Sequence, residues 1–163
     1  MASTLGEAFS HEVLQTLLVN PNYLLLPLLD QQFIEATDTG YRFSHPQIRK
    51  SIYHNISKPK RDEYHHTLAR YFQSRDKQRY AQHLDAADDP AAVNAYLHAA
   101  QAEKAGYHYA ACLRFLDRAA ALCIDTQQCY EIALQRGELL LESNTPLLAI
   151  QAFEQAFKLS TEP

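Results

Sequence analysis

His45 is the residue whose type and position most clearly suggest chemistry in this sequence of 163 residues. It stands directly before Pro46, and proline fits the first turn of a helix because its missing N–H would have no partner there. The sequence therefore predicts a helix over 46–56, with Ser44 or His45 as its cap. Unpaired backbone N–H groups at a helix start favour an anion such as phosphate. His45 is thus a candidate for phosphate contact, although capping of the helix and packing on the preceding strand would also explain it.

Four further residues are candidates for binding. Arg49 and Lys50 lie one turn after His45 and could reinforce an anion site, although helical spacing does not require Arg49 to face the same way. Arg61 and His65 fall near the start of the next expected helix. Both could contact a partner, and packing between adjoining elements is the alternative.

The sequence supports no other reaction chemistry. Its four glycines lie far apart, whereas a nucleotide-binding P-loop needs clustered glycines, so we expect no ATP hydrolysis by this chain alone. His65 and His66 are adjacent on an expected helix and suit separate roles better than shared metal ligation. Cys112, Cys123 and Cys129 lack metal-type spacing, and we expect reduced thiols. We therefore assign no catalytic residue, no metal site and no cofactor to this chain.

The elements that position His45 belong to an expected N-terminal unit over 1–57. Ser10 is a plausible cap for a helix over 10–18. A second helix is expected from Asn20-Pro21 to about Gln31, with a kink or early break at Pro27 because proline disrupts a helix interior.

A hairpin separates these two helices from the helix that follows His45. Strands are expected over 33–37 and 41–43, on either side of Asp38-Thr39-Gly40, which is a strong hairpin-turn signal. The order helix, helix, hairpin is that of a partial winged helix whose opening helix would precede Met1. We therefore expect the chain to be a fragment of a longer protein.

The charge distribution disfavours DNA binding by such a winged helix. Residues 1–41 contain no Lys or Arg and carry a net charge of −5, whereas duplex binding needs several cations. The positive charge lies in 42–79, which carries +7, and 80–163 carries −6. The central segment is interpreted as a solvated face or as a docking surface for an acidic or nucleotide-bearing module, with RNA as a further possibility.

From residue 58 onward the sequence predicts helices alone. The expected helices cover 61–73, 77–87, 90–105, 107–123, 127–142 and 146–159. The last part repeats itself with a period of 37 residues: Cys112, Leu116 and Ala119 are followed by Ala149, Phe153 and Ala156. This spacing is similar to that of a tetratricopeptide repeat (TPR), whose period is about 34, with a slightly long loop expected at 125–128.

The second copy of the repeat carries the small and large residues that let antiparallel helices interlock. Gly137, Ala149 and Ala156 permit close approach, and Phe153 fills the space that is left. The first copy is degenerate, since Ala100 stands at the position of the glycine. The fold class predicted is mainly α, with a partial winged helix and small hairpin over 1–57 and TPR-like helical hairpins over 58–163, and the helical array is expected to continue in a longer parent protein.

A set of weakly specific positions spread over nearly the whole chain resembles a known family. In the first half these are Phe43, His45, Ile48, Arg49, Tyr53, Arg61, His65, Leu68 and Ala69. In the second half they are Tyr80, Ala81, His83, Asp89, Pro90, Ala92, Tyr96, Ala99, Ala100, Gly106 and Tyr107. Together they resemble the region that follows the ATPase module in STAND-type signal-transduction ATPases, in bacterial proteins that carry cyclase, kinase or LuxR-type domains.

The resemblance implies a regulatory and not an enzymatic role. It implies that His45, with Arg49, senses the phosphate of ADP or ATP held in a neighbouring ATPase module, and that the helical hairpins bind other proteins. Lys50, Arg61 and His65 would contact a partner. The cysteine content separately indicates a cytoplasmic location. The alternative is a free-standing TPR adaptor that binds a peptide, and a DNA-binding regulator is disfavoured.

Overall fold

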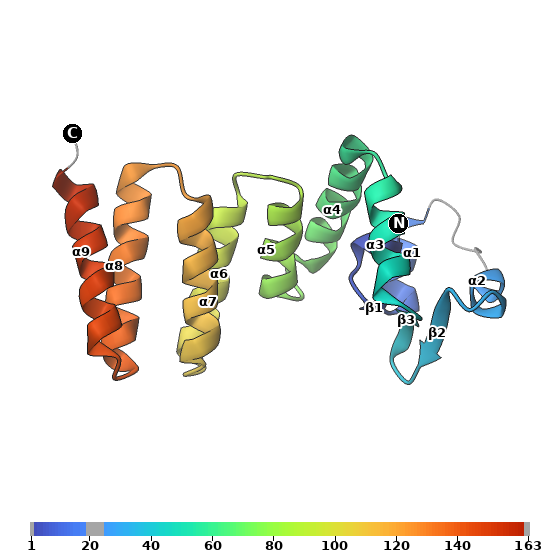
Figure 1. Cartoon of the computed structure of the whole chain (residues 1–163), viewed down its shortest axis with the longest axis horizontal. Coiled ribbons are helices and arrows are strands. Elements are labelled where there is room, and N and C mark those ends of the chain that lie inside the picture. The colour runs from blue at the N-terminus through green and yellow to red at the C-terminus, as the bar shows by residue number, and fades with distance from the viewer. Residues whose placement is uncertain (1, 19–24, 162–163) are drawn as a thin grey trace. The chain divides into compact units, whose positions relative to one another are not determined.

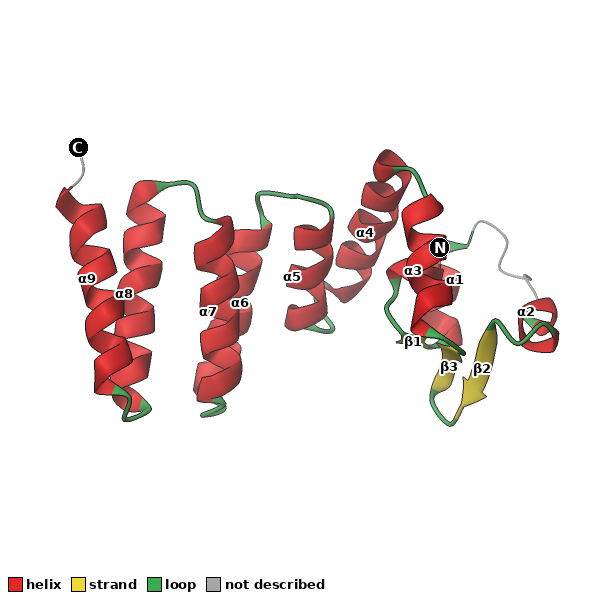
Figure 2. Cartoon of the chain, in the orientation of Figure 1, coloured by secondary structure: helices red, strands yellow, loops and turns green. Residues whose placement is uncertain are grey.

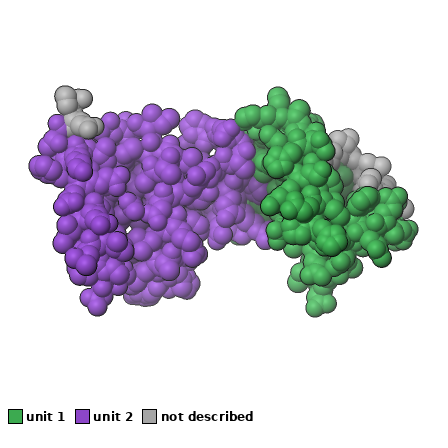
Figure 3. Space-filling view, in the orientation of Figure 1, with its two compact units in different colours: residues 1–75 green, residues 76–163 purple. Residues whose placement is uncertain are grey.

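A computed structural model describes residues 2–18 and 25–161, and the chain is mainly helical with one small antiparallel sheet (Figures 1 and 2). The predicted fold class is confirmed at this level. The chain divides into two compact units, residues 1–75 and 76–163, which are coloured separately in Figure 3. The sequence placed the boundary after residue 57. The structure places it later because helix α4 (Lys58–Phe72) packs against the N-terminal elements.

The helices of the first unit begin where the sequence provides caps and prolines. Helix α1 (His11–Leu17) is capped by Ser10, whose hydroxyl oxygen accepts a hydrogen bond of 3.2 Å from the backbone N–H of Val13. Helix α2 (Leu26–Asp30) has Pro27 in its first turn, where the sequence predicted a kink or early break. The expected start at Asn20-Pro21 lies outside the described residues.

The sheet has three strands in the order β1-β3-β2, with both pairs antiparallel. The hairpin of β2 (Ile34–Thr37) and β3 (Gly40–Phe43) confirms the predicted turn, since Thr37 lies opposite Gly40. Gly40 has φ +151°, and a Cβ atom there would come within 2.8 Å of the Cα of Ser10. Strand β1 (Ala8–Phe9) was not predicted, because two residues are too short to show an alternating pattern.

An apolar core holds the sheet to the helices of this unit. Its buried members come from β1, α1, β2, β3 and the residue before α2, namely Phe9, Leu14, Ile34, Phe43 and Leu25. Helix α3 (Pro46–Asn55) follows β3 directly and contacts that strand. The sheet and α3 therefore fix the position of His45 between them.

The described residues of the second unit form five helices, and each successive pair packs together. They are α5 (Lys77–Ala86), α6 (Ala92–Ala105), α7 (Tyr109–Leu122), α8 (Thr126–Glu142) and α9 (Pro146–Thr161). Figures 1 and 2 show them as a row of upright helices that alternate in direction. The expected helical hairpins are confirmed.

The same tight turn ends α5, α6 and α8. In each, the first residue after the helix cap is left-handed: Asp88 (φ 53°), Tyr107 (φ 60°) and Asn144 (φ 57°). The next N–H bonds back to a carbonyl five residues earlier, as in His108 to Glu103 and Thr145 to Leu140, both at 2.9 Å. These are Schellman turns. The 37-residue period of the sequence therefore holds in the backbone as well.

The extra residues of the 37-residue period do not form a long loop. Asp125 is the N-cap of α8, and Gln128 lies inside that helix, so the loop expected at 125–128 is wrong. Helix α8 has 17 residues, whereas α6 has 14. The additional three residues of the second copy lengthen its first helix.

Gly137 allows α8 and α9 to approach closely, as the sequence predicted. A Cβ atom at this position would overlap the ring of Phe153, with two further ring atoms at 2.7 Å. Ala149, Ala152 and Ala156 of α9 are buried on the same side. The space left free by the absence of a side chain at Gly137 is therefore filled by the aromatic ring of Phe153 on the neighbouring helix.

We predict that Tyr107→Gly raises the free energy of unfolding by about 1 kcal/mol, because a left-handed backbone is strained for a residue with a side chain and not for glycine. The matched variant Asn144→Gly should gain less, since asparagine tolerates this conformation. Urea unfolding of both variants provides the measurement. A loss of stability in Tyr107→Gly would contradict the expected strain.

Candidate functional site

His45 presents its imidazole to solvent at the start of α3. Its backbone is extended (φ −139°, ψ 135°), and its side chain makes no capping hydrogen bond to the helix. Pro46 occupies the first turn, as predicted. The side-chain capping that would explain His45 without a ligand is therefore not seen, and the ring is accessible to an external anion.

Arg49 is used inside the first unit. Its Nη1 donates a hydrogen bond of 3.2 Å to the backbone carbonyl of Ser3, in the short 3-10 helix η1 (Ala2–Thr4). This contact orients the guanidinium toward η1, and no hydrogen bond joins Arg49 to His45 in the described part of the chain. The Nε of Arg49 is buried and has no hydrogen-bond partner among the described residues. Lys50, the next residue, is exposed.

Arg61 and His65 meet at Tyr53 and tie α4 to α3. The hydroxyl of Tyr53 and Nε2 of His65 share a hydrogen bond of 3.0 Å, and the guanidinium of Arg61 lies 5.0 Å from the centre of the Tyr53 ring. Only 4% of His65 is exposed. This geometry favours the packing alternative for both residues, because the imidazole of His65 is covered by its own unit.

Burial also changes the protonation of His65. Loss of solvent lowers the pKa of the His65 imidazole to about 4, with the charges of Arg61 and His66 acting in the same direction and Asp62 opposing them. The ring is consequently neutral at pH 7. Its role is that of a hydrogen-bonded core residue and not of a cation offered to a partner.

Several cations of the +7 segment are paired locally. Lys58 contacts Asp62 at 3.0 Å and Lys60 contacts Glu63 at 2.7 Å, both along α4. Arg42 contacts Glu35 across the hairpin at 2.7 Å. These exposed pairs contribute little to stability, but they reduce the positive field that a nucleic acid or an acidic module would meet.

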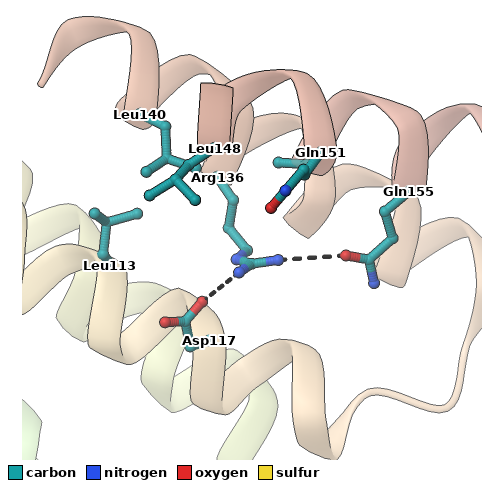
Figure 4. Close-up of a pocket in the computed structure, with 8 residues that line it drawn as sticks. Leu113, Asp117, Arg136, Leu140, Leu148, Gln151 and Gln155 are labelled. Atoms are coloured by element: carbon teal, nitrogen blue, oxygen red, sulfur yellow. Dashed lines mark hydrogen bonds and ion pairs between the residues drawn. The ribbon is translucent and has the colours of Figure 1, made fainter. Parts of the chain in front are cut away.

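In the second unit, α7, α8 and α9 enclose a hollow of about 310 Å³ (Figure 4). Its apolar wall is formed by leucines from all three helices, namely Leu113, Leu140 and Leu148. Its polar groups belong to Asp117, Arg136, Gln151 and Gln155. A surface of this size with mixed apolar and polar groups suits a side chain of a bound peptide.

Arg136 is the central polar group of this hollow. Figure 4 shows its guanidinium between Asp117 on α7, at 2.7 Å, and the side-chain oxygen of Gln155 on α9, at 3.3 Å. Its Nε is buried and has no hydrogen-bond partner in the described part of the chain. The sequence analysis did not select Arg136, because only the packing of three helices brings these side chains together.

A second charged centre, Asp85, joins three helices of this unit. Arg118 of α7 donates two hydrogen bonds to its carboxylate, at 2.6 and 2.7 Å, and the hydroxyl of Tyr96 on α6 donates a third at 2.9 Å. Burial acts to raise the pKa of Asp85, but the hydrogen bonds from Arg118 and Tyr96 outweigh it and the pKa is lowered. The three groups satisfy one another, which indicates a structural role.

The expectation of three reduced thiols is not met. Cys123, at the end of α7, and Cys129, in α8, form a disulfide with a Cα–Cα distance of 5.8 Å. The folded chain brings them together across the short connection between the two helices, which sequence spacing alone did not indicate. Cys112 is a buried free cysteine, and burial raises the pKa of its thiol.

Within residues 2–18 and 25–161, no group of three His, Cys, Asp or Glu side chains is arranged to hold a metal ion. None of the described helices combines the length and the apolar character that crossing a bilayer requires. Comparison with protein-family models, with curated proteins and with solved structures finds no match to this chain. The resemblance to STAND-type ATPases therefore stays a prediction.

We predict that His65 makes the folded chain less stable in mild acid. The unfolded imidazole binds a proton near pH 6.5 and the folded one near pH 4, so this stability is complete above pH 6.5 and is lost as the pH falls toward 4. Between pH 7.5 and pH 5 the loss should be about 2 kcal/mol in urea unfolding. His65→Gln should remove this part of the pH dependence. The neighbouring exposed residue supplies the control, His66→Gln, and equal pH profiles for both variants would contradict the assignment.

Proposed function

We propose that this chain is a non-enzymatic protein-interaction segment, and that its helical hairpins bind a partner through the hollow around Arg136. The observation that carries the proposal is the hollow itself, where leucines from three helices lie beside a guanidinium held by Asp117 and Gln155. An apolar side chain of a partner would pack against the three leucines, and a hydrogen-bond acceptor of the same partner would contact Arg136.

The more specific form of the proposal places the segment in a STAND-type signalling ATPase, where it would couple nucleotide state or ligand binding to an effector. Its support is the exposed imidazole of His45 at a helix start, a position that favours phosphate. ATP or ADP would be held by a neighbouring module. Arg49 contributes less than expected, because it is engaged with Ser3.

The alternative is a free-standing adaptor, and the same hollow supports it. A DNA-binding regulator is the weakest of the three, because α2 carries no basic residue and the cations of α4 are partly paired. The proposal includes a cytoplasmic location, in which the Cys123–Cys129 disulfide would meet reducing conditions.

Peptide selection tests the interaction role. Peptides selected from a displayed random library against the 163-residue chain should bind with micromolar affinity. Leu148→Glu should weaken them about tenfold or more, because Leu148 lines the hollow and is 51% exposed. The adjacent variant Leu147→Glu, at a position 77% exposed that does not line the hollow, is the control. Selection of no peptide, or equal binding to both variants, would count against the hollow.

The phosphate-sensing role needs a protein that also carries the ATPase module. There, His45→Ala should change the rate of ADP release, because the imidazole would contact the nucleotide phosphate. His54→Ala, at the other end of α3, is the matched control. Unaltered nucleotide exchange in His45→Ala would leave His45 without a sensing role.

A further inference from the structure

Helix α9 has a second apolar face that its own unit leaves uncovered. The alanines at 149, 152 and 156 are buried against the unit, whereas Ile150 and Phe157 are 53% and 69% exposed. These two residues, with Phe153, Glu154 and Lys158, line a shallow, mostly apolar hollow on the outside of the helix. We call this set the α9 outer face.

The repeat shows that such a face normally receives a helix. Moving back 37 positions from Ile150 and Glu154 leads to Leu113 and Asp117 of α7. Leu113 packs against the cluster formed by α8 and α9, and Asp117 pairs with Arg136 of α8. The corresponding positions of α9 therefore have the chemistry of a helix-packing surface, and no helix covers them in the described part of the chain.

The charges of the α9 outer face indicate which helix fits. Glu154 and Lys158 are one turn apart and lie on the same flank of the apolar strip. When two copies of one helix pack antiparallel about a two-fold axis, each flank meets the same flank of the other copy. Glu154 of one copy then lies opposite Lys158 of the other, twice in the same interface.

The apolar residues fit the same arrangement. Pairing Glu154 with Lys158 places the two-fold axis at the level of residue 156. Phe157 of one chain then lies about 3 Å, measured along the helix axis, from Phe157 of the other chain, since each helical residue rises 1.5 Å. The two Phe157 rings would meet at the centre, with the ion pairs at the edge, while the Phe153 ring stays packed on Gly137 of its own copy.

We propose that two copies of this chain associate through their α9 outer faces, packed antiparallel, to form a symmetric dimer. The occupant of the exposed surface is thus a second copy of the chain. The inference does not depend on a neighbouring ATPase module or on the hollow around Arg136.

Sedimentation of the 163-residue chain over a concentration series tests the dimer. The chain should sediment as a dimer that dissociates on dilution, and Phe157→Glu should be a monomer with unchanged circular dichroism. Ile124→Glu, at an exposed apolar position outside α9, should dimerise like the unmodified chain. A chain that is monomeric at the highest concentration, or a dimer that survives Phe157→Glu, overturns the proposal.

A charge exchange tests the two-fold arrangement. Glu154→Lys and Lys158→Glu each put like charges opposite each other and should weaken association about tenfold. The double variant restores both pairs with reversed sign, so it should dimerise within about threefold of the unmodified chain. If the double variant does not dimerise again, the antiparallel pairing is overturned. In a different arrangement, or with a different partner, the second substitution would weaken association further and not restore it.

Discussion

A left-handed residue directly after a helix cap is the constraint on which most of this structure depends. It occurs at the ends of α2, α5, α6 and α8, where Gln32, Asp88, Tyr107 and Asn144 have φ between 53° and 60°. In each turn two backbone N–H groups bond back to the helix, so the chain reverses without orphan donors. In the second unit these short reversals follow α5, α6 and α8 and make each of these helices an antiparallel neighbour of the next. Small residues such as Gly137 then determine how closely those helices pack.

Features specified by a few adjacent residues could be predicted from the sequence, and features made by distant contacts could not. Pro46 and the turn before Gly40 act locally, and the structure has them where expected. Packing between adjoining elements was one of the two interpretations of His65, but nothing around a histidine in the sequence shows that Tyr53 will be its partner. The hollow around Arg136 needs three packed helices and was missed for the same reason. His45 was predicted to lie at a helix start, where it could contact a phosphate, and the structure has it there. Its role in nucleotide sensing stays a prediction.

The two units use their charges in different ways. In the first unit part of the positive charge of residues 42–79 is neutralised by short-range ion pairs along α4 and across the hairpin. Arg49 and Arg61 make contacts within the same unit. In the second unit the charged groups link helices: Asp85 with Arg118, Asp117 with Arg136, and Lys104 with Glu142. The net charge counted along this sequence therefore overestimates the unpaired charge that is available to bind a partner.

The strength of packing is uneven along the second unit. Helices α8 and α9 pack on each other more extensively than α8 packs on α7, while Asp85 holds α5, α6 and α7 together as one group. Local opening of the second unit is therefore expected first between α7 and the α8–α9 hairpin, and it would appear as a shared, faster exchange of the hairpin's amide hydrogens with solvent.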